Sequence, residues 1–205
     1  MRLIVAAAAT AVLCSGCFGS VLQSSQEPPD LYRLAPPANA GGEAALAWAI
    51  SVPRPRASSS LDTQRIAVVM PGHRFDYLAG ARWADAAPQM VQQMLVDALG
   101  PPGRFSTAVA APSRVPADLL LDIELRRFEA VYANVDEAPT VVVEMQASLV
   151  DGRKGARVAS FDSRAEVTAA RNDRGAVVAA FEQAAGKVVD DVAGRARAAA
   201  ANLAR

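Results

Sequence analysis

The only two cysteines of the chain, Cys14 and Cys17, stand three positions apart in the stretch AVLCSGCFGS. Two thiolates at this C-x-x-C spacing can share a zinc ion or form a redox disulfide. A structural zinc site needs four ligands, and the single histidine, His73, could supply only a third. The pair is therefore a poor metal site, and the residues before it point to another chemistry.

An apolar run from Leu3 to Leu13 follows the positive charge of Arg2. The run is shorter than the roughly 20 apolar residues that a membrane-spanning helix needs, so it predicts a removable export signal. The small residues Ser15 and Gly16 then precede the second cysteine. This arrangement resembles the bacterial lipobox, in which a small pair precedes the cysteine that becomes the acylated N-terminus.

We therefore expect residues 1–16 to be a lipoprotein signal peptide and Cys17 to carry lipid, including palmitate. Cys14 is excluded as the acylated residue, because bulky Leu13 would sit at its cleavage position. A lipobox usually has Leu three residues before the cysteine, and here that place is taken by Cys14. The alternative is an ordinary cleaved signal peptide.

The charge balance argues against a nucleic-acid partner. The chain has 21 basic and 21 acidic residues, so no excess of positive charge would attract a polyanion. Roughly 190 residues remain after the signal, which suits a single domain with a sizeable core. Only one cysteine is left in this mature chain, so no internal disulfide can form.

A tether is expected between the acylated cysteine and the domain. Residues 17–30 are rich in Ser, Gln and Gly, include the pair Pro28-Pro29, and bury little. Fully extended, this segment reaches at most ~45 Å. The domain itself is expected to cover residues 31–205.

The first half of the domain predicts three strands and a helix. Short apolar stretches bounded by prolines or serines indicate strands at 31–37, 46–52 and 65–70. Residues 71–83 are interpreted as a loop that carries three aromatic side chains. A helix is expected over residues 84–99, ended by Gly100, with one apolar face made of Met90, Val91, Met94, Leu95 and Ala98.

The second half predicts three strands with alternating apolar residues and a final helix. The inward sets are Leu119, Leu121, Ile123 and Leu125, then Val141, Val143, Met145, Ala147 and Leu149, then Ala159, Phe161, Ala165 and Val167. Residues 151–155 supply the last hairpin turn. The final helix should start after the N-cap Asp173 and run to about Leu203, with Val177, Phe181, Ala184, Val188 and Val192 buried.

These elements predict one α/β (α+β) domain in the order β-β-β-α-β-β-β-α. Its sheet should be mixed and mostly antiparallel, because the long strands each have one apolar face and one polar face. Two amphipathic helices should pack on the apolar face of the sheet. No internal repeat is apparent.

We find no enzymatic constellation in the sequence. His73 is the only histidine, and neither a G-x-S-x-G elbow nor an S-x-x-K motif occurs. Asp190 and Asp191 are adjacent and so point apart on a helix. Asp122 and Glu124 share one strand face and could pair as acid and base, but a solvated face shared with Arg126 is the favoured interpretation. We expect no cofactor and no metal.

Five features occur in the order typical of one protein family. They are the lipobox, Tyr32 with Leu34, Leu61-Asp62 with Arg65-Ile66, Tyr77 with Arg82-Trp83, and the stretch Leu119 to Glu129. Together they resemble the auxiliary lipoproteins of ABC-type transport systems, the PqiC-like family. The resemblance covers residues 13–170, and it departs from the family where Leu78 replaces a frequent second aromatic residue.

The resemblance implies a non-enzymatic role beside an ABC permease, its ATPase and a periplasmic MCE-domain protein. Such systems move phospholipid or other lipophiles between the inner and outer membranes. The lipoprotein would be the membrane-anchored docking component, and a homo-oligomer stays possible. The alternatives are a structural or assembly lipoprotein of the cell envelope and, less favoured, a lipoprotein hydrolase.

Two further expectations concern location and contact. Residue Phe18 is not the aspartate that retains lipoproteins at the inner membrane of enteric bacteria, so we expect an outer-membrane anchor facing the periplasm. Inner-membrane anchoring stays open. The aromatic residues Phe75, Tyr77 and Trp83 are the candidate partner-binding residues, because exposed aromatics bury a large rigid area at low entropy cost. Packing of Trp83 against its helix is the alternative.

Overall fold

The computed structural model describes residues 28–35, 44–101 and 104–203. Its centre is an antiparallel meander of three long strands, β7 (Leu119–Val131), β8 (Thr140–Asp151) and β9 (Arg157–Thr168). Apolar residues on one face of these strands are buried, including all five inward residues expected on β8. The alternation predicted from the sequence is confirmed, and it places one face of the meander in the core.

The other edge of β7 is shared by three short strands that all run parallel to it. The strand β2 (Leu46–Val52) pairs with its start, β3 (Arg56–Ala57) with its middle and β4 (Arg65–Met70) with its end. The strand β6 (Phe105–Ala110) then adds to β2, again in parallel. The sheet is therefore mixed: its long pairs are antiparallel, as expected, and its short additions are parallel.

The segment interpreted as a loop is mostly a strand, and that part of the prediction is wrong. After a short turn, Pro71–His73, the ten residues of β5 (Arg74–Trp83) pair antiparallel with β4. Strand β1 (Asp30–Tyr32) adds in parallel to β5 and is shorter than the predicted 31–37. The polar and aromatic composition of β5 hid it, because most of its side chains are exposed at this end of the sheet.

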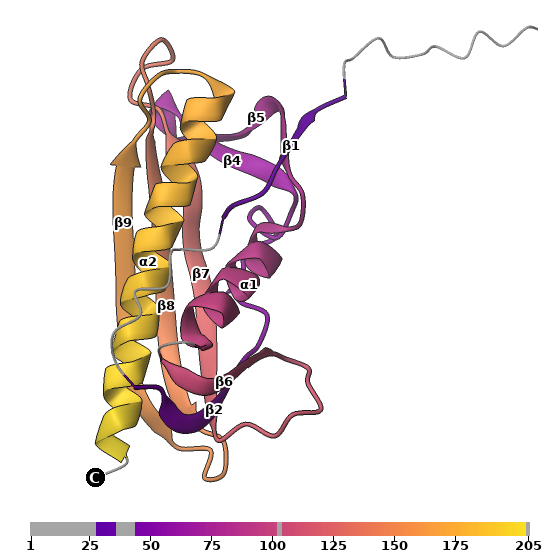
Figure 1. Cartoon of the computed structure of the whole chain (residues 1–205). Helices are drawn as coiled ribbons and strands as arrows, with labels where there is room; N and C mark the ends of the chain where they lie inside the picture. Colours follow the sequence, from indigo (N-terminus) through magenta and orange to yellow (C-terminus); the bar gives the residue numbers. More distant parts are fainter. Residues whose placement is uncertain (1–27, 36–43, 102–103, 204–205) are drawn as a thin grey trace, which may run out of the picture.

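Two helices cover the same face of the sheet, as predicted (Figure 1). Helix α1 (Ala87–Leu99) starts three residues later than expected, since Pro88 fits only in the first turn and disfavours helical backbone before it. Helix α2 (Arg174–Leu203) runs along β8 and β9. The Asp173 side chain accepts a hydrogen bond from the Ala176 N–H at 2.8 Å, so the predicted N-cap is confirmed.

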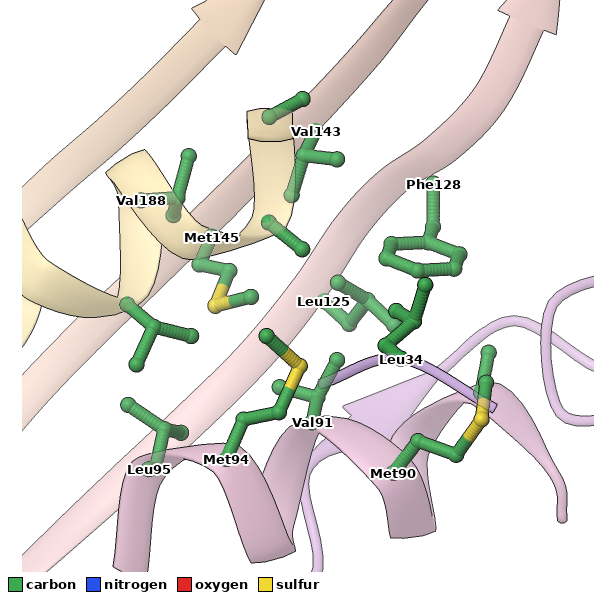
Figure 2. Packing of buried hydrophobic residues seen from close by; sticks show 14 of the residues in the cluster. Leu34, Met90, Val91, Met94, Leu95, Leu125, Phe128, Val143, Met145 and Val188 are labelled. Carbon is green, nitrogen blue, oxygen red and sulfur yellow. The ribbon is translucent and has the colours of Figure 1, made fainter. Parts of the chain in front are cut away.

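The core lies between the helices and the sheet (Figure 2). The predicted apolar faces of both helices are buried, from Met90 to Ala98 on α1 and from Val177 to Val192 on α2. Figure 2 shows Met94 and Val91 of α1 facing Met145 of β8 and Leu125 of β7. The last strand is the exception to full burial, because Ala159, Ala165 and Val167 are only partly covered near the sheet edge.

The proposed signal peptide, Cys14, Cys17 and most of the proposed tether lie outside the described residues. Among the helices that the structure describes, none is long and apolar enough to cross a membrane.

Candidate functional site

The three aromatic residues predicted as a contact surface do not stay together. The Trp83 side chain is fully buried. Its ring lies 5.2 Å from that of Phe181 and 5.8 Å from that of Phe128, measured between centroids. Trp83 is therefore a core residue, as in the alternative weighed from the sequence. The reason is its place at the end of β5, where odd-numbered side chains turn toward the helices.

Phe75 and Tyr77 lie at the surface of β5. Phe75 is 40% exposed, and its ring meets that of Tyr77 edge to face with centroids 5.3 Å apart. Tyr77 also contacts the Arg65 guanidinium, whose central carbon lies over its ring, 3.5 Å from the centroid. The Tyr77 hydroxyl donates a hydrogen bond to the Ser60 carbonyl at 3.2 Å. Tyr77 is thus a fixed platform between an exposed ring and a cation.

A wide bulge in β5 follows this platform. Arg65 pairs with Arg82 and Ala67 with Tyr77, so one residue of β4 stands opposite four residues of β5, 78–81. Gly80 lies inside the bulge with φ of +69°, a conformation that glycine adopts without strain. Bulges of this kind re-aim side chains and often adjoin functional sites. Here the bulge hollows the surface between β4, β5 and the start of α2.

The hollow is a pocket of about 630 Å³ lined by the bulge, by Pro28 and Pro29, and by four charged residues, Asp30, Arg65, Arg82 and Arg174. Arg174 reaches it from α2 and lies over Gly80: a Cβ atom on that glycine would come within 2.6 Å of the guanidinium. Arg174 also pairs with Asp30 of β1 at 3.3 Å. Strands β1, β4 and β5 and helix α2 therefore all contribute to one site.

The family-typical motifs contain parts of this site, but the sequence does not bring them together. Arg65 belongs to one motif and Tyr77 and Arg82 to the next, and the structure places all three around the same pocket. Arg174 was missed, because it follows the N-cap of a helix 92 positions after Arg82 in the chain. The sequence places Arg65 at the start of a predicted strand and Arg82 in the predicted loop, and only the fold shows that α2 begins beside them.

A second hollow, of about 560 Å³, adjoins the first on the far side of Arg174 and is lined partly by Tyr132 and Asn172. The Tyr132 hydroxyl lies 3.3 Å from the Asn172 Oδ1 atom. Burial raises the pKa of Tyr132 above its ordinary value, so the phenol stays neutral and acts as a hydrogen-bond donor. This hollow therefore combines a hydrogen-bond donor with the charged residues Asp30, Asp173 and Arg174, and it lacks the excess of arginines found in the first.

The carboxylates considered as acid and base candidates are paired with arginines. Asp122 binds Arg56 at 3.0 Å, and Glu124 lies 3.9 Å from Arg126. Two further pairs involve the adjacent helix residues, because Asp190 pairs with Arg104 and Asp191 with Arg195. The charged face of the sheet is thus a set of surface ion pairs, which is the structural interpretation left open from the sequence.

His73, the only histidine, is exposed in the turn between β4 and β5 with φ of +61°. It follows Gly72, which also has positive φ, and the two residues form the tight reversal between the strands. The described residues contain no group of three or more histidines, cysteines or carboxylates placed to hold a metal ion.

Solved structures share this fold. A crystal structure of a protein from Xanthomonas campestris, assigned to the family model DUF330, matches with a TM-score of 0.77 and 26% identity, covering 85% of this chain and 98% of that one. A second crystal structure, of an uncharacterised protein, matches with a TM-score of 0.62 at 17% identity, covering 84% of this chain and 99% of that one. The second likeness shows the fold alone.

Sequence comparison gives one curated relative and a family. An uncharacterised protein of Bradyrhizobium diazoefficiens is 30% identical over 164 residues, which are 80% of this chain and 43% of the relative, so the chain spans less than half the length of that protein. The model of the ABC-type transport auxiliary lipoprotein component matches residues 31–193, nearly all of the domain described above. The chain therefore belongs to the family of ABC-type transport auxiliary lipoproteins.

Proposed function

We propose that this chain is a membrane-anchored periplasmic lipoprotein that acts as a non-enzymatic docking component of an ABC/MCE-type system for intermembrane transport of phospholipid or another lipophile. The observation that carries the proposal is the family match over residues 31–193, downstream of a lipobox. The pairing of the candidate catalytic carboxylates with arginines supports a binding role rather than a catalytic one.

The partner in this proposal is a periplasmic MCE-domain protein, and through it the ABC permease and ATPase. The acyl chains on Cys17 hold the domain at the outer membrane, because the next residue, Phe18, is not the aspartate that retains lipoproteins at the inner membrane of enteric bacteria. The tether of residues 17–30 gives the domain a reach of ~45 Å from the bilayer. Several copies of the domain could assemble around one partner, which makes a homo-oligomer part of the proposal.

The proposed docking surface is the β1–β5 edge of the sheet. Phe75 is 40% exposed there, and Leu31 of the edge strand β1 is 69% exposed. Tyr77 stands behind Phe75 and fixes its position through the edge-to-face contact. An exposed ring on a rigid support is the kind of anchor that dominates binding energy at protein interfaces. Trp83 supports this surface from the core side, because it packs the end of β5 against Phe181 of α2.

Co-purification tests the proposal directly. The tagged full chain should bring down the MCE-domain protein and the permease from cross-linked envelopes, and Phe75→Ala should reduce their recovery while the melting curve stays unchanged. Val115→Ala is the matched control, since Val115 is 47% exposed and lies just before the start of β7, whereas β4 pairs with the end of that strand. Recovery of a cell-wall or secretion complex in place of the transporter would instead support the structural or assembly role and overturn the transport proposal.

A further inference from the structure

The pocket beside the β5 bulge gathers positive charge in a chain that is neutral overall. Arg65, Arg82 and Arg174 line it together with a single carboxylate, that of Asp30. The local excess is two positive charges, whereas the full chain has 21 basic and 21 acidic residues. We propose that this pocket binds a phosphate group, carried either by a lipid headgroup or as free phosphate.

Two of these arginines are placed unfavourably with respect to each other. Arg65 and Arg82 are direct cross-strand partners on β4 and β5. Like charges directly opposite each other destabilise a sheet. Within the residues that the structure describes, neither makes an ion pair with a carboxylate, whereas most other arginines on the sheet face do. A bound anion between the two guanidinium groups would relieve this repulsion.

The arginines are held in place before any ligand arrives. The Arg65 guanidinium lies over the Tyr77 ring, with its central carbon 3.5 Å from the ring centroid, and the Tyr77 hydroxyl is bonded to the Ser60 carbonyl. Contact with a ring face leaves the guanidinium N–H donors free for a bidentate contact with an anion. Arg174 is fixed over Gly80 and by Asp30, which uses one of its donors. Preorganised donors cost less to order on binding.

The number of arginines in the pocket favours one kind of anion over another. A lone carboxylate is matched by one guanidinium, and Asp30 already fills that role for Arg174. A phosphate group offers several acceptor oxygens around one centre and matches two or three guanidinium groups at once. The pocket volume of about 630 Å³ leaves room for a substituent esterified to the phosphate, such as a glycerol unit.

The position of the pocket suggests a lipid as one source of the phosphate. Pro28 and Pro29, near the end of the predicted tether, form part of its wall. The pocket lies where the predicted tether joins the domain, and the exposed residue Leu31 lies on the neighbouring strand β1. An acylated Cys17 would therefore hold the pocket within the reach of the tether from the membrane. The lipid source therefore rests on the proposed anchoring function, whereas free phosphate does not.

Calorimetric titration of the full chain in non-ionic detergent tests the site. The probes are inorganic phosphate, dihexanoyl phosphatidylglycerol and, as the matched control without phosphate, dihexanoylglycerol. Saturable binding of inorganic phosphate is expected, and Arg82→Gln should weaken it roughly tenfold or more, since a charged hydrogen bond is worth about 1.5–3 kcal/mol. Tighter binding of the phospholipid than of free phosphate would assign the lipid source, and equal or weaker binding the free anion.

Melting curves separate a binding role from a structural one. Phosphate should raise the melting temperature of the native chain but not that of Arg82→Gln, because a ligand stabilises only the state that binds it. Without phosphate the variant should melt no lower than the native chain, since a repulsive charge pair has been removed. Arg157→Gln, an exposed arginine on β9, is the control and should respond to phosphate as the native chain does.

Equal phosphate affinity in the native chain and Arg82→Gln, or no saturable binding, would overturn the proposal and leave an acidic segment of a partner protein as the occupant. The outcome is independent of the transporter assay. A chain that binds phosphate yet recovers no MCE protein would contradict the proposed function alone, and a chain that recovers the transporter without binding phosphate would contradict this inference alone.

Discussion

The rings of Trp83 and Phe181 meet edge to face, with their centroids 5.2 Å apart and their planes at 83°. The contact joins the end of β5 to the buried face of α2, and Phe128 of β7 completes the cluster, with its ring centroid 5.0 Å from that of Phe181. Three parts of the chain that lie far apart in the sequence are therefore fastened at one point. The surface residues of β5 depend on this cluster for their position.

Phe181→Ala should lower the free energy of unfolding by about 3–5 kcal/mol, because it leaves a cavity beneath both Trp83 and Phe128. Urea denaturation followed by circular dichroism measures the change. Glu182→Ala, at the exposed neighbouring position, is the control and should change stability little. A loss below about 1 kcal/mol for Phe181→Ala would mean that α2 does not pack on this cluster.

Gly80→Ala should be more destabilising than Gly155→Ala. Both glycines have positive φ, so both variants carry similar backbone strain of about 1–2 kcal/mol. A Cβ at Gly155 meets nothing within 4 Å, whereas one at Gly80 would displace the Arg174 guanidinium. The excess cost at Gly80 should vanish in the Arg174→Ala background. A cycle of four melting curves measures this coupling, and additive effects would contradict the contact.

Asp173→Ala should lower the melting temperature at neutral pH, because α2 loses its N-cap. The Ala176 N–H and then Arg171 hold the pKa of Asp173 below its ordinary value. A lowered folded-state pKa gives stability that is present above the unfolded pKa and is lost as pH falls through the folded one. The gap between the native chain and Asp173→Ala should therefore narrow as the pH falls below about 3.9, the ordinary pKa of an aspartate.

Thermal melts from pH 7 down to pH 2 measure this gap. Asp173→Asn is the informative control, since asparagine also caps a helix but carries no titrating carboxyl. It should keep most of the stability at neutral pH. A gap that stays constant across the acid range would show that the cap does not depend on the charge of Asp173.

Cys17→Ala should release the protein from the membrane or mislocalise it, whereas Cys14→Ala should have almost no effect. Each buried methylene of an acyl chain contributes ~0.8 kcal/mol, and several chains on one cysteine hold a protein stably on a bilayer. Envelope fractionation and palmitate labelling measure the effect. Labelling that persists after the loss of Cys17 would refute the assignment, and retention in the inner-membrane fraction would contradict the proposed outer-membrane location.

The regular parts of the fold could be predicted because a single periodicity governs each of them. On β8 an apolar residue occupies every second position from Val141 to Leu149, and all five are buried. On α2 the stripe from Val177 to Val192 keeps helical spacing under a capping aspartate. In both elements each residue faces either the core or the solvent, so the local pattern and the final environment agree.

The strands that were missed lack such a pattern. β3 is two residues long and follows Pro55, so its pairing with β7 comes from the tertiary fold rather than from local preference. In β5 the bulge at residues 78–81 breaks the alternation, and its exposed aromatics suggested a loop. The candidate pocket was hidden for the same reason, because it is formed by that bulge and by an arginine from a distant helix.

The division of one edge of β7 among three earlier strands has a consequence for how the domain reaches its native state. A nascent chain that ends at Leu99 already contains β2 and β3, yet all of their partners, β6 and β7, come later. Their apolar side chains and unpaired backbone groups must wait until residues 105–125 have emerged. Pairings of such long sequence separation make folding slow and expose edges that aggregate. The domain should therefore fold late and cooperatively, after most of the chain has been synthesised.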